Sequence, residues 1–264
     1  MYWLSCLSVG VGWCCDFSDA PGSIPSEIGH LTSLEWIALV DSHFHGKLPT
    51  ELGQLTRLTV LSILENALEG SIPTELGLLS SSLYLFSCRD NNLTGPIPSE
   101  LALLTNLSVS LNMRNNMLSS TVPTQLGHLT DLMELELSGN HLTGQIPSEI
   151  GQLTLLAKLT LANNSLSGSV PQELSALWQL LYMLSLEGNT QLHGSMPQAL
   201  CSLNGTCVTT LINWCEGLDG VSFDCTSLLC GCDCPCNGAW KRLAMESLDV
   251  VGNPNQMDPN RWWK

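Results

Sequence analysis

A block of the form Gly-x-Ile-Pro recurs along most of the chain and constrains its fold more than any other feature. The prolines of these blocks stand at positions 25, 49, 73, 98, 123, 147, 171 and 197, so their spacings are 24, 24, 25, 25, 24, 24 and 26 residues. Self-similarity at a fixed period of about 20–50 residues is the signature of a repeat architecture. The sequence therefore predicts a solenoid in which each repeat supplies one coil.

The segments between these prolines follow a second pattern, Leu-x-x-Leu-x-Leu-x-x-Asn, which is clearest at Leu156, Leu159, Leu161 and Asn164. Leu-x-Leu alternation has a period of two, which is typical of a short strand with one buried face. Stacked coils would join such strands into a parallel sheet with neighbours about 4.8 Å apart. The Ile-Pro-x-Glu-Leu-Gly segment is expected to turn the chain on the opposite side, because Pro fixes φ and Gly permits the turn.

Together the two motifs resemble the plant-type leucine-rich repeat, which is found in extracellular receptor ectodomains and in polygalacturonase-inhibiting proteins. The resemblance covers about residues 22–200. It implies an α/β solenoid, a right-handed horseshoe with a parallel concave sheet and short helical or 3-10 turns on the convex side.

The same resemblance divides the chain into four parts. They are a partial N-terminal cap at 1–21, about seven to eight coils of 24–26 residues at 22–200, a cysteine-rich C-terminal cap at 201–236 and a flexible tail at 237–264. The cysteine-rich tail is similar to tails that follow repeat domains in algal, diatom-like members. Caps are expected because the end coils of a solenoid otherwise expose apolar core.

An asparagine recurs after each strand segment, and we interpret this column as a buried structural ladder rather than a ligand site. Its members are Asn66, Asn91, Asn116, Asn140, Asn164 and Asn189. In this repeat family such side chains bond the backbone of the turn and of the neighbouring coil. The intervals from Leu79 to Leu83, from Leu107 to Leu111 and from Leu180 to Leu184 are longer than in the other coils, and Thr190 adds a residue after Asn189. We expect the extra residues to bulge at strand ends, because a slip through a strand would turn leucines outward.

The outward strand positions are the predicted partner-binding surface, since solenoids of this kind use the concave face for partners. Candidate residues are Trp36, Leu64, Tyr84, Leu85, Arg89, Arg114, Glu134 and Glu136. Aromatic residues and arginine are the usual anchors of interfaces. The alternative is an ordinary sheet surface that carries incidental apolar residues.

The sequence predicts no enzyme and no cofactor. Glu134 and Glu136 share a strand face, and paired carboxylates can hydrolyse glycosides. However, an open sheet face is expected to offer little of the burial that raises a carboxylate pKa. His43 and His45 have metal-ligand chemistry but lack a third ligand, so no metal site is predicted.

Two further columns have local explanations. A hydroxyl column, which either bonds its own turn or matches ice, comprises Thr32, Thr56, Ser80, Thr105, Thr130 and Thr154. An acidic convex ridge comprises Glu27, Glu51, Glu75, Glu100, Glu149 and Glu173. Carboxylates favour the start of a helical turn, and a cation or basic partner is the alternative role for this ridge.

The twelve cysteines favour an oxidising compartment. Cys88 stands at a leucine position and is expected to be a buried free thiol. Disulfide candidates are Cys201, Cys207, Cys215, Cys225, Cys230, Cys232, Cys234 and Cys236. For the run of Cys230, Cys232, Cys234 and Cys236, thiolate binding of a soft metal is the alternative. Glycosylation candidates are Asn92, Asn106, Asn163 and Asn204.

Charge and hydropathy exclude several classes of function. The formal net charge is −15, which argues against nucleic acid and against an anionic membrane surface. No apolar run reaches the roughly 18 residues of a membrane-spanning helix. We therefore expect an extracellular or cell-surface recognition scaffold that binds a protein, peptide or glycan. The alternatives are an inhibitor of a secreted wall-degrading hydrolase and an ice-binding protein.

Overall fold

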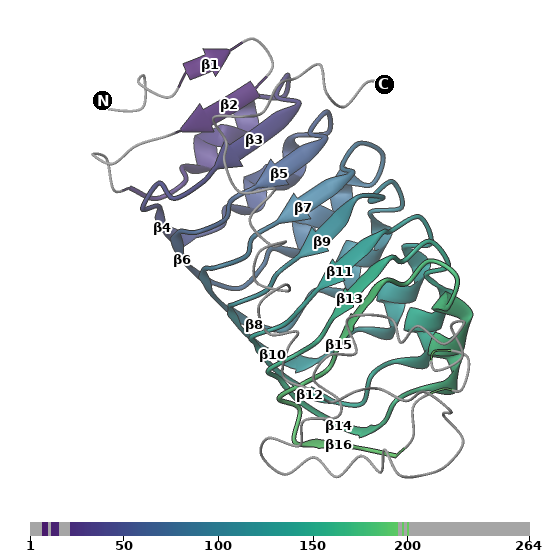
Figure 1. Cartoon of the computed structure of the whole chain (residues 1–264). Coiled ribbons are helices and arrows are strands. Elements are labelled where there is room, and N and C mark those ends of the chain that lie inside the picture. Colours follow the sequence, from purple (N-terminus) through teal and green to yellow (C-terminus); the bar gives the residue numbers. More distant parts are fainter. Residues whose placement is uncertain (1–6, 10–11, 16–21, 195–196, 198–199, 201–264) are drawn as a thin grey trace, which may run out of the picture. The chain divides into compact units, whose positions relative to one another are not determined.

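The structure is a computed structural model that describes residues 7–9, 12–15, 22–194, 197 and 200. In this part of the chain each repeat forms one coil, and the coils stack in sequence order (Figure 1). A coil contains a strand of a nine-stranded sheet, a strand of a seven-stranded sheet and a 3-10 helix. The predicted leucine-rich-repeat solenoid is thereby confirmed.

The nine-stranded sheet carries the strands that the Leu-x-Leu pattern predicts. They are β1 (Leu7–Val9), β2 (Gly12–Cys15), β3 (Trp36–Leu39), β5 (Val60–Ser62), β7 (Leu85–Ser87), β9 (Ser110–Asn112), β11 (Glu134–Glu136), β13 (Lys158–Thr160) and β15 (Met183–Ser185). Neighbours pair in parallel from β2 to β15, and β1 pairs antiparallel with β2.

The seven-stranded sheet was not predicted. Its strands are β4 (His45–Lys47), β6 (Ala67–Gly70), β8 (Asn92–Gly95), β10 (Met117–Thr121), β12 (His141–Gly144), β14 (Ser165–Ser169) and β16 (Gln191–His193). Six of them form along the segment that follows a ladder asparagine, and β4 follows Ser42 at the equivalent place in the first coil. All seven pair in parallel. In β8 and β12 one buried leucine lies between exposed residues, which is enough for a strand on the edge of a coil.

The seven proline blocks from Pro25 to Pro171 each lead into a 3-10 helix behind the nine-stranded sheet (Figure 1). The helices are η2 (Ser26–His30), η3 (Thr50–Gln54), η4 (Thr74–Leu79), η5 (Ser99–Leu103), η6 (Thr124–His128), η7 (Ser148–Gln152) and η8 (Gln172–Leu177). In every case proline is the N-cap in an extended conformation, where its missing N–H costs no helical hydrogen bond.

The core is one continuous column of leucines between the two sheets and the helices. Leu61, Phe86, Leu111, Leu135 and Leu159 are fully buried and stand in register on successive coils, so one phenylalanine takes a leucine place in the column. Because a coil buries these side chains only against its neighbours, the stability of each coil depends on the stack.

The extra residues enter the coils in two different ways. Between Leu107 and Leu111 the extra residue lies at the start of β9, where two successive carbonyls, those of Ser108 and Val109, bond the next coil. Between Leu79 and Leu83 the prediction of a strand-end bulge is wrong. There η4 has six residues and Ser80 continues in helical geometry, so the turn absorbs the residue and the strand register is kept.

Three predicted features lie wholly or partly outside the described residues. They are the cysteine-rich cap at 201–236, the tail at 237–264 and most of the cap at 1–21, and the eight disulfide candidates and Asn204 fall with them. Among the residues that the structure does describe, no helix has the length and apolar character needed to cross a membrane.

Candidate functional site

The outward face of the nine-stranded sheet, called the concave face below, presents side chains in registered columns. The first column runs through Trp36, Val60, Leu85, Ser110 and Glu134 and continues to Lys158 and Met183. The second runs from Ala38 through Ser62, Ser87, Asn112, Glu136 and Thr160 to Ser185. Residues from coils about 24 positions apart in the sequence therefore meet on one surface.

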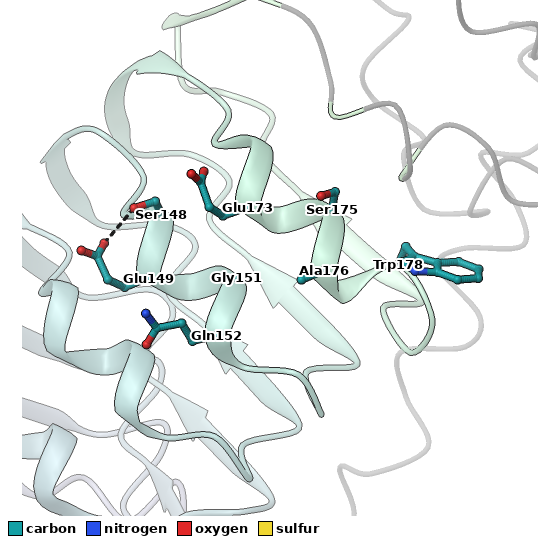
Figure 2. A pocket seen from close by; sticks show the side chains of 8 residues that line it. All are labelled: Ser148, Glu149, Gly151, Gln152, Glu173, Ser175, Ala176 and Trp178. Carbon is teal, nitrogen blue, oxygen red and sulfur yellow. Dashed lines mark hydrogen bonds between the residues drawn. The ribbon is translucent and has the colours of Figure 1, made fainter.

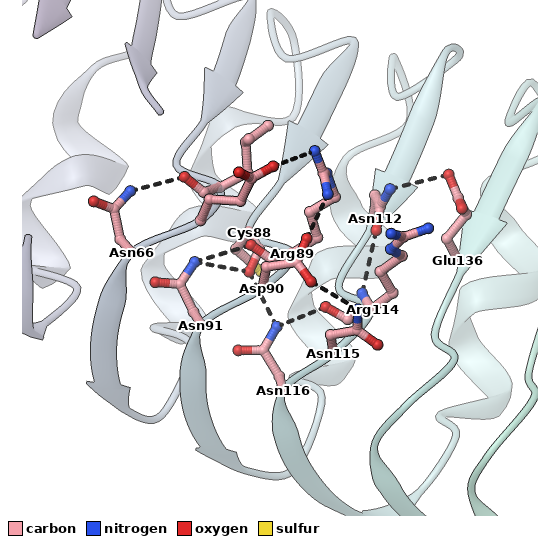
Figure 3. Close-up of polar contacts among 12 residues, drawn as sticks. Asn66, Cys88, Arg89, Asp90, Asn91, Asn112, Arg114, Asn115, Asn116 and Glu136 are labelled. Atoms are coloured by element: carbon pink, nitrogen blue, oxygen red, sulfur yellow. Dashed lines mark hydrogen bonds and ion pairs between the residues drawn. The ribbon is translucent and has the colours of Figure 1, made fainter. Parts of the chain in front are cut away.

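The asparagine column lies beneath the edge of this face and is used within the scaffold. The Nδ2 atom of Asn140 donates to the carbonyl oxygen of Met113 in the preceding coil at 3.0 Å, and its Oδ1 atom accepts from the Leu118 amide at 3.0 Å. The same pattern recurs at Asn66, Asn91 and Asn116. Figure 3 shows the side-chain amides of these three residues donating to backbone carbonyl oxygens. These amides hold neighbouring coils together and have no free group to offer a ligand.

The N-terminal half of the concave face is apolar. Trp36, Leu64 and Leu85 are half-buried, and Tyr84 is 41% exposed at the start of its strand. The register places Trp36 and Leu85 on either side of Val60. The structure thus brings the predicted apolar residues onto one surface, but adds no polar group that would orient a ligand there.

Arg89 is occupied by partners within the protein. Its guanidinium lies 2.6 Å from the Glu65 carboxylate and also pairs with Asp90 (Figure 3). Arg114, one coil further, makes no ion pair within the described residues, and its buried Nε atom has no hydrogen-bond partner. Of the two predicted arginines, only Arg114 offers its charge to a ligand.

Glu136 is also occupied. Its residue is 5% exposed, its Oε2 atom lies 2.8 Å from Lys158 Nζ, and its Oε1 atom accepts from Asn112 Nδ2 at 3.0 Å. A buried carboxylate needs such a cation and a second donor, because leaving it unpaired in the low-dielectric interior is costly. Glu136 and Lys158 are therefore a structural ion pair on the concave face.

Because Lys158 pairs with Glu136, the second carboxylate of this strand, Glu134, has no ion-pair partner among the described residues. Glu134 is half-buried. Burial raises the pKa of Glu134 above its ordinary value, with a smaller rise from Glu136, while Lys158 and a hydrogen bond with Ser110 lower it. The expectation that this face offers too little burial to raise a carboxylate pKa is wrong for Glu134. With Glu136 held by Lys158, however, the two carboxylates are not both available as an acid and a base.

Tyr182 is a residue that the sequence reasoning missed. It occupies the same place in its coil as Tyr84, just before the strand, and is 53% exposed. Burial of its hydroxyl raises the pKa of Tyr182, and the negative charge of Glu134 raises it further. The match with Tyr84 was a signal in the sequence, but only the structure shows that Tyr182 stands beside Glu134.

The convex side offers weaker features. Figure 2 shows a shallow hollow along η7 and η8, with the carboxylates of Glu149 and Glu173 on one side and Trp178 at its rim. The Ser148 hydroxyl donates to Glu149 at 3.3 Å, and the same bond recurs at Glu27, Glu51, Glu75 and Glu100. Most glutamates of the acidic ridge thus accept a hydrogen bond from the hydroxyl group that precedes them at the start of the 3-10 helix.

The remaining candidates are placed as follows. In the hydroxyl column, the expected hydrogen bonds to the residues' own turns do not form; Ser80 is half-buried, and the exposed members are Thr32, Thr56, Thr105, Thr130 and Thr154.

The glycosylation candidates within the described residues are exposed, so the surface is open for glycans at Asn92, Asn106 and Asn163. His43 and His45 are exposed, and no group of three His, Cys, Asp or Glu that could hold a metal occurs in the described part. Cys88 is a buried free thiol, and burial raises its pKa to about 12.

The repeats, the two sheets and the comparisons with known proteins identify the chain as a leucine-rich-repeat protein, with repeats like those of plant extracellular receptors. The family model for the Leucine Rich Repeat matches residues 131–153 and 155–177. No curated protein sequence matches the chain.

Several solved structures are similar. A TDR receptor is 37% identical with a TM-score of 0.65, and the match covers 69% of this chain and 31% of the receptor chain. The Arabidopsis receptor kinase HAESA, solved with the peptide hormone IDA and the co-receptor SERK1, is 30% identical with a TM-score of 0.60, over 74% of this chain and 37% of HAESA. A plant ice-binding protein is 25% identical with a TM-score of 0.61, over 74% of this chain and 68% of that protein. This chain thus spans about a third of the length of the two receptors.

Proposed function

We propose that this protein is a non-enzymatic recognition scaffold that binds a peptide on its concave face, in an extracellular or cell-surface setting. The observation that carries the proposal is the combination of an unpaired carboxylate at Glu134, an unpaired guanidinium at Arg114 and an exposed aromatic ring at Tyr182 on one sheet face. Groups of these three types anchor ligands at interfaces. The similarity to HAESA, a receptor solved with a peptide hormone, supports a peptide as the ligand class.

A matched pair of methionine variants tests this proposal. Met183 is half-buried on the concave face in register with Lys158, and Met117 is 42% exposed on the second sheet. We expect a displayed library of random 12-residue peptides to yield binders to the protein. The variant Met183→Arg should lose them, and Met117→Arg should keep them. Equal binding by both variants would place the site elsewhere, and a library without binders would reject the peptide as ligand class.

Inhibition of a secreted wall-degrading hydrolase is a further role for the same face. The coils at 22–200 carry 15 acidic and 5 basic side chains, so their formal charge is 5 − 15 = −10. Such a charge would steer a basic enzyme toward the face and repel an acidic polysaccharide. Activity of polygalacturonase that stays unchanged with excess protein would argue against this role.

Ice binding is the second candidate function, and one observation favours it. The exposed threonines at 32, 56, 105, 130 and 154 leave their hydroxyls unbonded to the described residues and stand at the same place in their coils, which only Ser80 interrupts. A plant ice-binding protein has the same fold. An ice recrystallisation assay with a Thr56→Val/Thr105→Val/Thr130→Val variant tests it. Inhibition that the variant weakens would support ice binding, while absence of inhibition by the unmodified protein would reject it.

A further inference from the structure

Three buried polar atoms without a partner gather on one part of the concave face. Among the side chains that the structure describes, the buried atoms that lack a hydrogen bond are Arg114 Nε, Ser138 Oγ and Thr160 Oγ1. Arg114 follows β9, Ser138 follows β11 and Thr160 ends β13, so they belong to three successive coils. Thr160 is only 7% exposed. Folded proteins rarely leave such groups unsatisfied, so this cluster points to a ligand that completes them.

All three groups can donate a hydrogen bond. A guanidinium N–H is a donor only, and a hydroxyl group donates as well as accepts. The complementary ligand therefore presents acceptors at several points along its length. Main-chain carbonyl oxygens of an extended peptide do so at regular intervals, and an extended chain advances about 3.3 Å per residue.

The charge beside this cluster is negative. Lys158 lies in register with Glu134 on the neighbouring strand, yet its ammonium is committed to Glu136 at 2.8 Å. One lysine thus serves two carboxylates, and the charge of Glu134 is compensated only in part, by the more distant Lys158 and by a hydrogen bond with Ser110. Tyr182 adds an aromatic ring close enough for the charge of Glu134 to act on its hydroxyl. A carboxylate with an adjacent ring is a combination that recognises a guanidinium or ammonium group.

We propose that the concave face over β9, β11 and β13 binds an extended peptide through one basic side chain, arginine or lysine, which is held by Glu134 and Tyr182. Carbonyl oxygens of the same peptide accept hydrogen bonds from Arg114, Ser138 and Thr160. Glu134 precedes Ser138 by four residues, so the basic side chain and the carbonyl oxygen that Ser138 binds are separated by roughly 13 Å, or about four residues of extended ligand. Thr160 lies nearer to Glu134, because it is in register with Glu136. This inference rests on the proposed function and specifies its ligand.

The first test compares Glu134→Gln with Glu69→Gln, a matched substitution on the exposed face of β6 in the second sheet. The probe is the most enriched peptide from the displayed 12-residue library. We expect the enriched peptides to share one arginine or lysine, and Glu134→Gln to weaken binding about 10- to 100-fold, since the lost contact is a charged hydrogen bond. Glu69→Gln should bind like the unmodified protein.

Replacing the shared basic residue of the peptide by citrulline, or by norleucine if it is lysine, closes a double-mutant cycle. The unmodified protein should lose affinity for the neutral peptide, and Glu134→Gln should show little further loss. Peptides that bind without a shared basic residue, or that bind Glu134→Gln unchanged, would overturn the inference while the proposed function stands. A library that yields no binders would instead reject the proposed function and this inference with it.

A second variant tests the donor cluster. Thr160→Val keeps the shape of the side chain and removes the unsatisfied hydroxyl. We expect the melting temperature to stay the same or rise, because no bond within the protein is lost, and the affinity for the selected peptide to fall several-fold. A Thr160→Val protein that is destabilised but binds with unchanged affinity would show that the hydroxyl serves the fold rather than the ligand.

Discussion

Removal of a single ladder asparagine should destabilise the protein more than its size suggests. Asn140 is 5% exposed, and its side chain forms four hydrogen bonds, of which those to Leu118 N and Met113 O join two coils. Asn140→Ala leaves the buried Leu118 amide without a partner, whereas the Met113 carbonyl keeps its hydrogen bond from Asn116. At about 1–3 kcal/mol for an unsatisfied buried group, the expected loss in the free energy of unfolding is about 1–3 kcal/mol.

Urea unfolding followed by circular dichroism measures this loss, with Asn92→Ala as the matched control. Asn92 is exposed on β8 and its side chain makes no hydrogen bond with the described residues, so its removal should change stability by less than about 0.5 kcal/mol. Hydrogen exchange of the Leu118 amide should accelerate in Asn140→Ala. If the two variants unfold at the same urea concentration, the asparagine column does not hold the coils together and our reasoning about it is wrong.

Four further predictions concern single groups. Lys158→Met leaves the Glu136 carboxylate buried and unpaired, so urea unfolding should show a loss of about 3–5 kcal/mol, and Lys158→Met/Glu136→Gln should regain most of it. Gly127→Ala would place a Cβ atom 2.5 Å from a backbone oxygen of the next coil, so the melting temperature should fall with a loss of about 1–3 kcal/mol. Cys88, with its pKa raised to about 12, should resist N-ethylmaleimide in the native protein and react in denaturant; native labelling detected by peptide mass spectrometry would contradict its burial. Because the folded pKa of Glu134 lies above its ordinary value of 4.5, the stability linked to this group is present below that pH and is lost as the pH rises through the folded pKa. Glu134→Gln should therefore raise the melting temperature at pH 7 and leave it unchanged at pH 3.

The candidate site was predictable in its position but not in its chemistry. The period of the repeats places Glu134 beside Lys158 and Glu136 beside Thr160, because identical coils stack in register. The repeat period does not determine whether Glu134 or Glu136 forms the ion pair with Lys158. That choice depends on the side-chain conformations that packing allows, and Tyr182 was missed for the same reason.

The sequence by itself determined the coil, the register and the inward leucines, because each of these follows from a local pattern that repeats about every 24 residues. Tertiary structure alone decided that a second sheet forms and that η4 rather than a strand absorbs the extra residue. It also decided that Arg89 and Glu136 form ion pairs, whereas Arg114 and Glu134 form none with the described residues. The physical reason is that periodicity fixes where a side chain starts, whereas pairing and burial depend on neighbours that the stacked coils bring together.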